Sequence, residues 1–343
     1  MGSVLITGGT GFIGSHIVEA FCQKGIKAGC LVRKNSNFNN IKHLPVKLEY
    51  GDIEDVESLI DIFKNYNFII HVAALAGDWG CYEKFYNINV EGTLNVLKAC
   101  KENNIEDIII TSSISVYGEE NSEKIKDENS PHKSHYPYFL DDIFPCGMNY
   151  YRNSKALAKE KAIAFSKENN QNLTIIEPVW VYGEREFNTG FYEYLKTASA
   201  GVPLFPGSKK NKFHVIYAKD LARAYLLAYE KKLKGINSFI IGNRKVQLMD
   251  EIYKVFCDKA KIKKPRTLPK SVVYPLGFLM ELFYALFRIK SAPLLTRGRV
   301  NMLYDSIEYS TKKAEEILGF VNEYNLEEGI EKTVKWYKNN GYI

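Results

Sequence analysis

The sequence is short of three features that would assign a protein to particular classes. It has no C-x-x-C pair among its six cysteines, no run of five or six basic residues, and no low-complexity linker. Net charge is only +6, so the sequence gives no indication of nucleic-acid binding. The cysteines predict reduced, buried thiols. The first predicted strand begins at Val4, which leaves no room for a signal peptide, and we therefore expect a cytoplasmic location.

A glycine-rich turn near the start of the chain is its most informative stretch. Val4–Thr7 is an apolar run suited to a buried strand, and a helical pattern opens at Ser15. Between them, Gly9, Gly11 and Gly14 match G-x-G-x-x-G, the turn that lets a helix N-terminus meet a pyrophosphate. The turn residues predicted to bind a dinucleotide are Gly8, Gly11, Phe12, Ile13 and Gly14.

Strand and helix patterns alternate along the first half of the chain. This alternation predicts an α/β protein with a Rossmann-type, doubly wound parallel sheet. We assign 1–184 to a dinucleotide-binding domain, with 211–245 returning to it, and 185–210 and 246–343 to a smaller C-terminal substrate-binding subdomain. The further strands predicted are 28–32, 46–50, 68–72, 107–111 and 173–176, with 213–217 and 238–241 returning to the sheet, and the helices include 56–64, 90–101, 219–231 and one from about 151.

The residues after the second, third and fourth strands bear on the choice of cofactor. NAD-binding proteins usually place an acid about 20 residues after the glycine turn, but Arg33 stands there, and a guanidinium suits a 2′-phosphate. We therefore predict NADP as the preferred cofactor, with NAD as the alternative. Asp52 and Ile53 are predicted to lie beside the adenine, and Ala73 and Ala74 to allow close approach of the backbone.

A serine, a tyrosine and a lysine form the candidate catalytic set. Ser113 follows the fifth strand, and Tyr151 and Lys155 lie four residues apart, on one helix face. An ammonium beside a phenol lowers the phenol's pKa and makes it usable as a proton donor or acceptor. Tyr150 is the neighbouring candidate, but its spacing to Lys155 fits one face less well.

These motifs together resemble an extended short-chain dehydrogenase/reductase of the NAD-dependent epimerase/dehydratase superfamily. The resemblance implies catalytic Ser113, Tyr151 and Lys155, with Lys155 also contacting the nicotinamide ribose. It also implies a supporting role for Asn89, positions near the nicotinamide for Pro178 and Val181, and a homodimer formed through the helices at 90–101 and 151–167. The motifs on which the resemblance rests are Thr7-Gly8-x-x-Gly11-x-x-Gly14, Asp52, His71–Ala74, Asn89–Thr93, Ser113 with Val116–Gly118, Tyr151-x-x-x-Lys155 and Pro178-x-x-Val181-Tyr182-Gly183. The interval from Ser113 to Tyr151 is longer than the family usually has, which leaves an insertion at 119–148 unexplained.

The C-terminal half is similar to the 3β-hydroxysteroid dehydrogenase-like branch, which includes 2-alkyl-3-oxoalkanoate reductases. This similarity rests on Ala292–Arg297 and on Tyr309–Phe320, and 75–80 also resembles the oxoalkanoate reductases. It implies an NAD(P)-dependent oxidoreductase acting on a small hydrophobic 3-hydroxy or 3-oxo substrate. The alternatives are a nucleotide-sugar 4-epimerase with tightly bound NAD and a non-catalytic NADP sensor.

One apolar stretch in the second half bears on membranes. Among residues 271–289 only Glu281 and Arg288 are charged, and apolar residues recur at helical spacing. Pro275 and these charges make the stretch a poor transmembrane helix. We predict either a lid over an apolar substrate or a helix on a membrane surface, with a plain core helix as the alternative. The basic residues within 259–264 would face anionic lipid.

Two histidines in the insertion, His132 and His135, lie without a cysteine or an acid at ligand spacing. The predicted chemistry needs no metal, and we expect none.

Overall fold

The computed structural model describes residues 3–118, 124–187 and 190–343. Its centre is a seven-stranded parallel sheet with the order β11-β6-β5-β4-β1-β2-β3, which confirms the doubly wound Rossmann-type fold. The strands are β1 (Val4–Thr7), β2 (Ala28–Val32), β3 (Lys47–Tyr50), β4 (Phe68–His71), β5 (Asp107–Thr111), β6 (Asn172–Pro178) and β11 (Ile236–Ile241).

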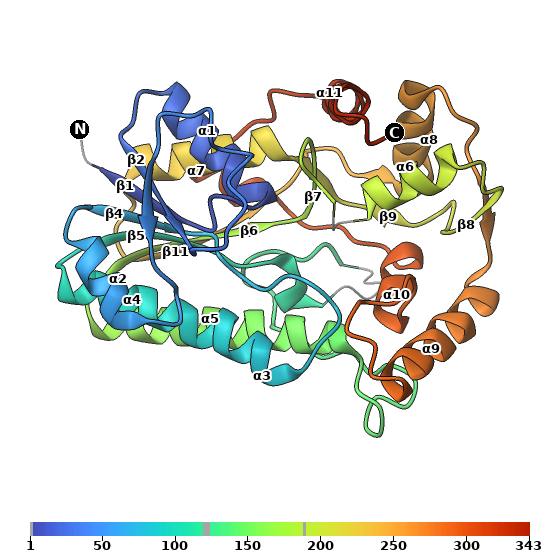
Figure 1. The fold of residues 1–343 in the computed structure, drawn as a ribbon, viewed down its shortest axis with the longest axis horizontal. Coiled ribbons are helices and arrows are strands. Elements are labelled where there is room, and N and C mark those ends of the chain that lie inside the picture. Colours follow the sequence, from blue (N-terminus) through green and yellow to red (C-terminus); the bar gives the residue numbers. More distant parts are fainter. Residues whose placement is uncertain (1–2, 119–123, 188–189) are drawn as a thin grey trace.

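Helices cover both faces of this sheet (Figure 1). One layer contains α1 (Phe12–Gln23) and α7 (Ala218–Lys231), and the other contains α2 (Val56–Phe63), α4 (Gly92–Glu102) and α5 (Gly147–Glu168). Strands β1, β4 and β2 are mostly apolar and are buried along their whole length, as expected in a parallel sheet covered on both faces.

The strand order brings the carboxyl ends of the central strands together. The chain runs from β1 outward to β3 on one side, then crosses to β4 and continues to β6 on the other. Thr7 pairs with Leu31 of β2 and with His71 of β4, so the carboxyl ends of these strands lie together. This is the crevice in which doubly wound sheets bind ligands.

Part of the predicted return to the sheet is wrong. Within 213–217, β10 (Val215–Tyr217) pairs with β7 (Trp180–Tyr182) in a separate two-stranded sheet, while β9 (Lys212–Phe213) pairs with β12 (Gln247–Leu248). The intervening His214 is buried and its imidazole bonds the carbonyl oxygen of Asn243. One apolar run therefore serves two different partners, and only β11 joins the central sheet.

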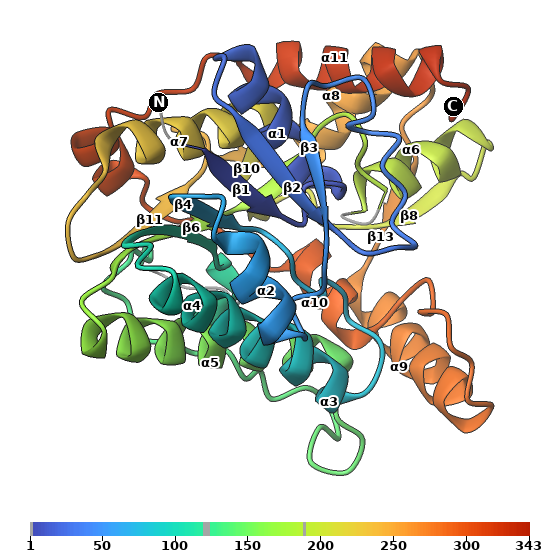
Figure 2. The ribbon, with the colours of Figure 1, turned by 60° about the vertical axis from the view of Figure 1, so that its left-hand side comes forward.

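A smaller lobe lies at one end of the sheet (Figures 1 and 2). It contains α6 (Phe191–Ser199), β8 (Leu204–Pro206), α8 (Met249–Ala260), β13 (Arg266–Leu268), α9 (Lys270–Leu286) and α10 (Arg297–Tyr304), and α11 (Leu326–Asn339) packs on α8. The short elements that pack on the helix layers or the central sheet are α3 (Tyr82–Phe85), the π-helix η1 (Tyr86–Glu91), η2 (Ile114–Tyr117) and η3 (Ala314–Leu318). In the described parts of the chain, none of the helices combines the length and hydrophobicity that a bilayer crossing demands.

Candidate active site

The glycine turn after β1 has the geometry that a bound pyrophosphate needs. Gly8 has φ +70°, and a Cβ there would lie 2.6 Å from the backbone nitrogen of Ala73. A Cβ on Gly14 would lie 2.2 Å from the carbonyl oxygen of Gly8. Within the described chain, α1 begins after exposed Gly11 with neither a side-chain cap nor an acid in its first turn, where Phe12 and Ile13 lie. Its positive N-terminus is therefore available to an anion, and the residues fit a dinucleotide.

A hydrogen-bonded belt joins the ends of β1 and β4. The Thr93 hydroxyl donates to the carbonyl oxygen of Asn89 (2.7 Å), so it accepts from Nε2 of His71 (3.1 Å), and Nδ1 then accepts from Thr7 Oγ1 (2.8 Å). Thr7 Oγ1 in turn accepts from the backbone nitrogen of Ala73 (3.2 Å). Burial, together with the Lys155 charge, lowers the pKa of His71 to about 3, so this histidine is a neutral, fixed strut.

The other predicted cofactor contacts after β2, β3 and β4 differ in exposure and in their packing. Arg33 lies exposed just after β2, and Ala74 is exposed after β4, so both are accessible at the crevice edge. The Asp52 carboxylate accepts from the backbone nitrogen of Glu54 (3.2 Å), which is a turn-capping bond. Ile53 is buried, and its Cδ1 would lie 2.8 Å from a Cβ on Gly92, so it packs against α4.

The two predicted contacts beyond β6 are buried. Pro178 closes β6 and pairs with Ile241 of β11. Val181 lies in β7, is 5% exposed and belongs to the main hydrophobic core. Asn40, which the sequence analysis did not single out, donates from Nδ2 to the carbonyl oxygen of Thr10 (3.2 Å) and so ties the loop after β2 to the glycine turn.

The predicted serine and lysine are brought to the end of β5. Lys155 is buried on α5, and its Nζ donates to the carbonyl oxygen of Thr111 (2.6 Å). Ser113 follows two residues later, half-buried, with Oγ accepting from the backbone nitrogen of Ser115 (3.2 Å). Burial lowers the pKa of Lys155 to about 8, although the nearby Glu177 carboxylate opposes this effect. Lys155 is therefore still a cation at pH 7, bound to the carbonyl oxygen of Thr111, which precedes Ser113 by two residues.

Tyr151 lies one helical turn before Lys155 and on the same face of α5. The helix begins at Gly147, earlier than the sequence predicted, so both residues lie within regular helix. Tyr150 is directed elsewhere, since its ring packs edge to face on Tyr82 with centroids 5.7 Å apart. Burial raises the pKa of Tyr150, which makes it a poorer proton carrier. The packing of Tyr150 leaves Tyr151, one helical turn from Lys155, as the candidate proton carrier.

Asn89 holds the catalytic helix against the loop after β4. It sits in the π-helical turn η1, a distortion that is frequent at functional sites. Its amide bonds both backbone groups of Leu75 (2.7 and 3.1 Å) and donates to Ser154 Oγ (2.9 Å). Ser154 precedes Lys155, so this bridge fixes the position of the lysine relative to the crevice.

A buried ionic cluster that the sequence did not predict lies beneath the site. Lys159 Nζ lies 2.9 Å from Oε1 of Glu177 and 2.8 Å from the hydroxyl of Tyr117, which itself donates to Oε2 of Glu177 (2.7 Å). Lys159 and Glu177 are almost completely buried. Lys159 follows Lys155 by one helical turn, and that spacing was the signal that could have revealed it.

The insertion predicted at 119–148 connects the site to the smaller lobe. Residues 119–123 lie outside the described part. In the remainder, His132 pairs with Glu160 (3.1 Å) and His135 with Asp141 (3.2 Å). Within the described chain no group of three or more potential ligands is placed to hold a metal ion.

A second buried pair anchors the insertion to α9 and α10. Arg297 is completely buried, with Nε 2.5 Å from Glu281 of α9, and it donates to the carbonyl oxygens of Phe139 and Phe144. Arg299 binds both carboxylate oxygens of Asp78 (2.7 and 2.8 Å), in the loop after β4. Two arginines of one short helix therefore hold the insertion and the loop after β4 to the smaller lobe.

Comparison with known proteins agrees with this geometry. Residues 4–242 match the model of the NAD dependent epimerase/dehydratase family. The chain is 25% identical to a 2-alkyl-3-oxoalkanoate reductase of Stenotrophomonas maltophilia, with 96% of this chain and 97% of that protein covered. It is also 25% identical to a sterol-4-alpha-carboxylate 3-dehydrogenase of Schizosaccharomyces pombe, with 98% and 97% covered.

Epimerases are similar as well. The chain is 29% identical to a putative UDP-glucose 4-epimerase of Methanocaldococcus jannaschii, with 98% of this chain and 99% of that protein covered. Among solved structures, UDP-glucose 4-epimerase of Thermus thermophilus in complex with NAD superimposes with a TM-score of 0.74 at 22% identity, covering 98% and 99% of the two chains. The family model alone spans well over half of the residues, so this chain belongs to the NAD dependent epimerase/dehydratase family and is an enzyme of the extended short-chain dehydrogenase/reductase type.

Proposed function

We propose that the protein is an NADP-preferring reductase or dehydrogenase of a hydrophobic 3-hydroxy or 3-oxo compound, either sterol-like or an alkyl-3-oxo acid. The observation that carries the redox chemistry is the buried Lys155 ammonium. It is held at the carbonyl oxygen of Thr111, two residues before Ser113, and Lys155 lies one helical turn after Tyr151. Burying a charge is costly, and buried charges with perturbed pKa values concentrate at functional sites; the position of Lys155 one helical turn after Tyr151 supports this role.

These side chains have complementary roles in the reduction of a ketone. A bound nicotinamide dinucleotide supplies the hydride for the carbonyl carbon. The Tyr151 hydroxyl delivers its proton to the carbonyl oxygen as the alcohol forms, and Lys155 stabilises the phenolate left behind. Ser113 donates a hydrogen bond to the same oxygen as its negative charge develops. In the oxidative direction Tyr151 takes the proton instead.

The preference for NADP rests on Arg33. It lies exposed after β2, whose carboxyl end adjoins that of β1 and the glycine turn. A guanidinium binds a 2′-phosphate with two charge-assisted hydrogen bonds, but it gives the ribose hydroxyls of NAD no acceptor. Lys34, also exposed, adds a second positive charge at this edge.

The smaller lobe supports a hydrophobic substrate. Similarity to the oxoalkanoate reductase and to the sterol dehydrogenase extends over nearly the whole chain and so includes the lobe, which lies mostly beyond the region matched by the family model. Both arginines of α10 are neutralised internally, Arg297 by Glu281 and Arg299 by Asp78. A nucleoside diphosphate needs cations that are free to meet its phosphates, and neither arginine is free.

A nucleotide-sugar 4-epimerase is the second candidate, favoured by the 29% identity to the putative UDP-glucose 4-epimerase over almost the full length. Both activities use the same three side chains, so the site alone separates them less well than cofactor handling does. An epimerase regenerates its cofactor in every cycle and gains nothing from releasing it. A non-catalytic NADP sensor is the third candidate, and it has no need of a phenol tuned by a buried ammonium.

The decisive experiment is to purify the protein without added cofactor, denature it, and identify any nicotinamide released. The proposal expects little bound NAD, exchangeable binding of NADPH, and NADPH-dependent turnover of 2-alkyl-3-oxo acids or 3-oxo sterols. Near-stoichiometric NAD with interconversion of UDP-sugars would instead establish the epimerase. NADPH binding with no turnover across the substrate panel would favour the sensor.

A further inference from the structure

Helix α9 of the smaller lobe turns its large apolar side chains to the outside. Leu286 is 74% exposed and Phe287, just beyond the helix, is 61% exposed. The buried stripe consists of Val273, Gly277 and Glu281, so the acid of the helix lies inside. This is the reverse of an ordinary amphipathic helix and excludes the plain core helix that the sequence analysis kept as an alternative.

The buried acid explains this orientation. Glu281 accepts from both the Nε and the backbone nitrogen of Arg297 (2.5 and 2.7 Å). Breaking one partner of such a buried pair is strongly destabilising, so the pair fixes the rotation of α9 about its axis. Gly277 allows the close contact, because a Cβ there would lie 3.3 Å from the backbone of Thr296. With Glu281 and Gly277 fixed on the inner side, the apolar side of the helix faces outward.

A second segment, distant in sequence, extends the same surface. The loop at 139–143 exposes Phe139, Leu140 and, at 82%, Ile143. It is fastened to α9, because the Phe139 ring packs edge to face on Phe278 with centroids 5.3 Å apart and its backbone nitrogen donates to the Tyr274 hydroxyl. We call the combined surface the apolar ridge; its residues are Val272, Leu276, Leu279, Leu282, Phe283, Leu286 and Phe287 with Phe139, Leu140 and Ile143.

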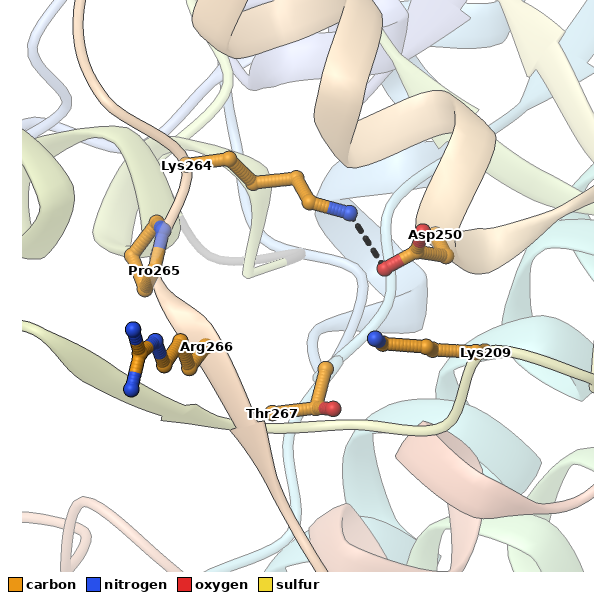
Figure 3. A pocket seen from close by; sticks show the side chains of 6 residues that line it. All are labelled: Lys209, Asp250, Lys264, Pro265, Arg266 and Thr267. Atoms are coloured by element: carbon orange, nitrogen blue, oxygen red, sulfur yellow. Dashed lines mark hydrogen bonds and ion pairs between the residues drawn. The ribbon is translucent and has the colours of Figure 1, made fainter.

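Positive charge lies at both ends of α9. Arg288 and Lys290 are exposed just beyond its C-terminal end. At the other end, β13 leads into the helix and borders a hollow of about 380 Å³, into whose lining Lys209, Lys264 and Arg266 contribute cations (Figure 3). In this hollow Lys264 is paired with Asp250 (2.5 Å), which leaves an excess of positive charge. Asp142 is the exposed acidic residue within 139–145 and 270–290, and Glu281 is buried, so this surface carries little negative charge.

We propose that the apolar ridge docks on an anionic lipid bilayer, with α9 lying in the plane of the interface and the cations at its ends meeting lipid phosphates. Large apolar residues flanked by cations are the pattern of interfacial helices. Helix α9 lies at the outer edge of the smaller lobe, where it can reach a flat surface (Figures 1 and 2). A second copy of the chain would bring like charges together, and charge complementarity therefore favours the bilayer. The proposal does not depend on the proposed function.

The test is flotation of the full chain with vesicles, either phosphatidylcholine alone or phosphatidylcholine with 30% phosphatidylserine, at low and high salt. The matched variants are Leu279→Glu/Phe283→Glu on the ridge and Val202→Glu/Val321→Glu, which adds the same charge at exposed apolar positions elsewhere. We expect the native protein and the control to bind anionic vesicles, the ridge variant to bind at least tenfold less, and salt to weaken binding. Circular dichroism checks that each variant is folded.

Several results would overturn the proposal. These are failure of the native protein to bind anionic vesicles at low salt, equal binding to neutral vesicles, or equal loss in the control variant. A self-association that sedimentation shows to be lost in the ridge variant, without vesicle binding, would make the ridge an interface between copies. As a test that needs no charge on the ridge, Phe283→Trp is compared with the native protein, which has three tryptophans of its own. The variant should gain a blue-shifted emission that brominated lipid quenches; no gain over the native protein would contradict insertion.

Discussion

Helices α5 and α9 depart in opposite ways from the rule that charged residues face water and apolar residues face the interior. Helix α5 buries Lys155 and Lys159, whereas α9 exposes a row of leucines and phenylalanines and buries Glu281. On α5, Lys155 lies at the crevice beside β5, and Lys159 lies beneath it, paired with Glu177. On α9 the buried charge is structural, and the unusual feature is the surface left outside. We interpret the first departure as serving the proposed chemistry and the second as serving the proposed docking.

The largest effect should come from removing the phenol of α5. We expect Tyr151→Phe to lower kcat by about 10³-fold, since the proton donor is lost while binding surfaces remain. Tyr150→Phe is the matched control and should retain most activity, because its ring packs edge to face on Tyr82 and its spacing to Lys155 fits one helix face less well. Steady-state turnover and circular dichroism of both variants make the measurement. Comparable losses in the two variants would contradict the assignment.

The buried ion pair between Lys159 of α5 and Glu177 of β6 should affect stability differently when one partner is removed and when both are replaced. Lys159→Met alone strands the Glu177 carboxylate and should lower the free energy of unfolding by about 3–5 kcal/mol. The double variant Lys159→Met/Glu177→Leu removes both charges and should recover most of that loss. Urea unfolding of the two variants measures the difference. A double variant as unstable as the single one would show that the pair itself holds the fold.

Arg33 offers a smaller, specific effect at the cofactor edge. Arg33→Asp should lower the ratio of kcat/KM for NADPH to that for NADH by about 10- to 100-fold, because a charge-assisted contact worth about 1.5–3 kcal/mol is replaced by repulsion. Lys24→Asp, which makes the same charge change on an exposed residue at the far end of α1, should leave the ratio unchanged. If the native protein uses both cofactors equally, Arg33 does not read the 2′-phosphate.

The pH dependence gives the subtlest test. With a Lys155 pKa of about 8, the ammonium is present at pH 7 and is lost as pH rises through 8, so kcat/KM should fall on the alkaline side. The Glu177 carboxylate raises the pKa of Lys155, and Glu177→Gln should therefore move the alkaline limb to lower pH. The same lowered pKa means that the unfolded chain holds this proton more tightly, so its contribution to stability increases with pH from about 8 towards the ordinary lysine value. An alkaline limb that does not move would separate Lys155 from the Glu177 charge.

Local patterns in the sequence were sufficient to predict the strands and the helix face that border the crevice. The strands Ala28–Val32 and Asp107–Thr111 agree residue for residue with prediction, because short buried runs bounded by turns leave little freedom. The Tyr151–Lys155 face also follows from spacing alone. The hydrogen-bond partners of Thr7, His71 and Thr93 could not be predicted from local patterns, because these bonds join strands and helices far apart in sequence.

Long-range partners account for what the sequence could not predict. The periodicity of α9 indicates which residues share a face, but the inward face is chosen by Arg297, which lies on another helix. The run at 213–217 has strand character, yet its division between β12 and β7 depends on where those strands lie. The ridge residues of the 139–143 loop carry no periodic signal at all.

The most direct test of the central claim is net hydride transfer. The protein would be incubated with NADPH carrying deuterium at the transferred C4 position and with a 2-alkyl-3-oxo acid or a 3-oxo sterol, and the product analysed by mass spectrometry. We predict a 3-hydroxy product with one deuterium on the carbinol carbon, formed in step with NADP and lost in Tyr151→Phe. No net transfer to any such ketone, together with interconversion of UDP-sugars on tightly held NAD, would contradict it.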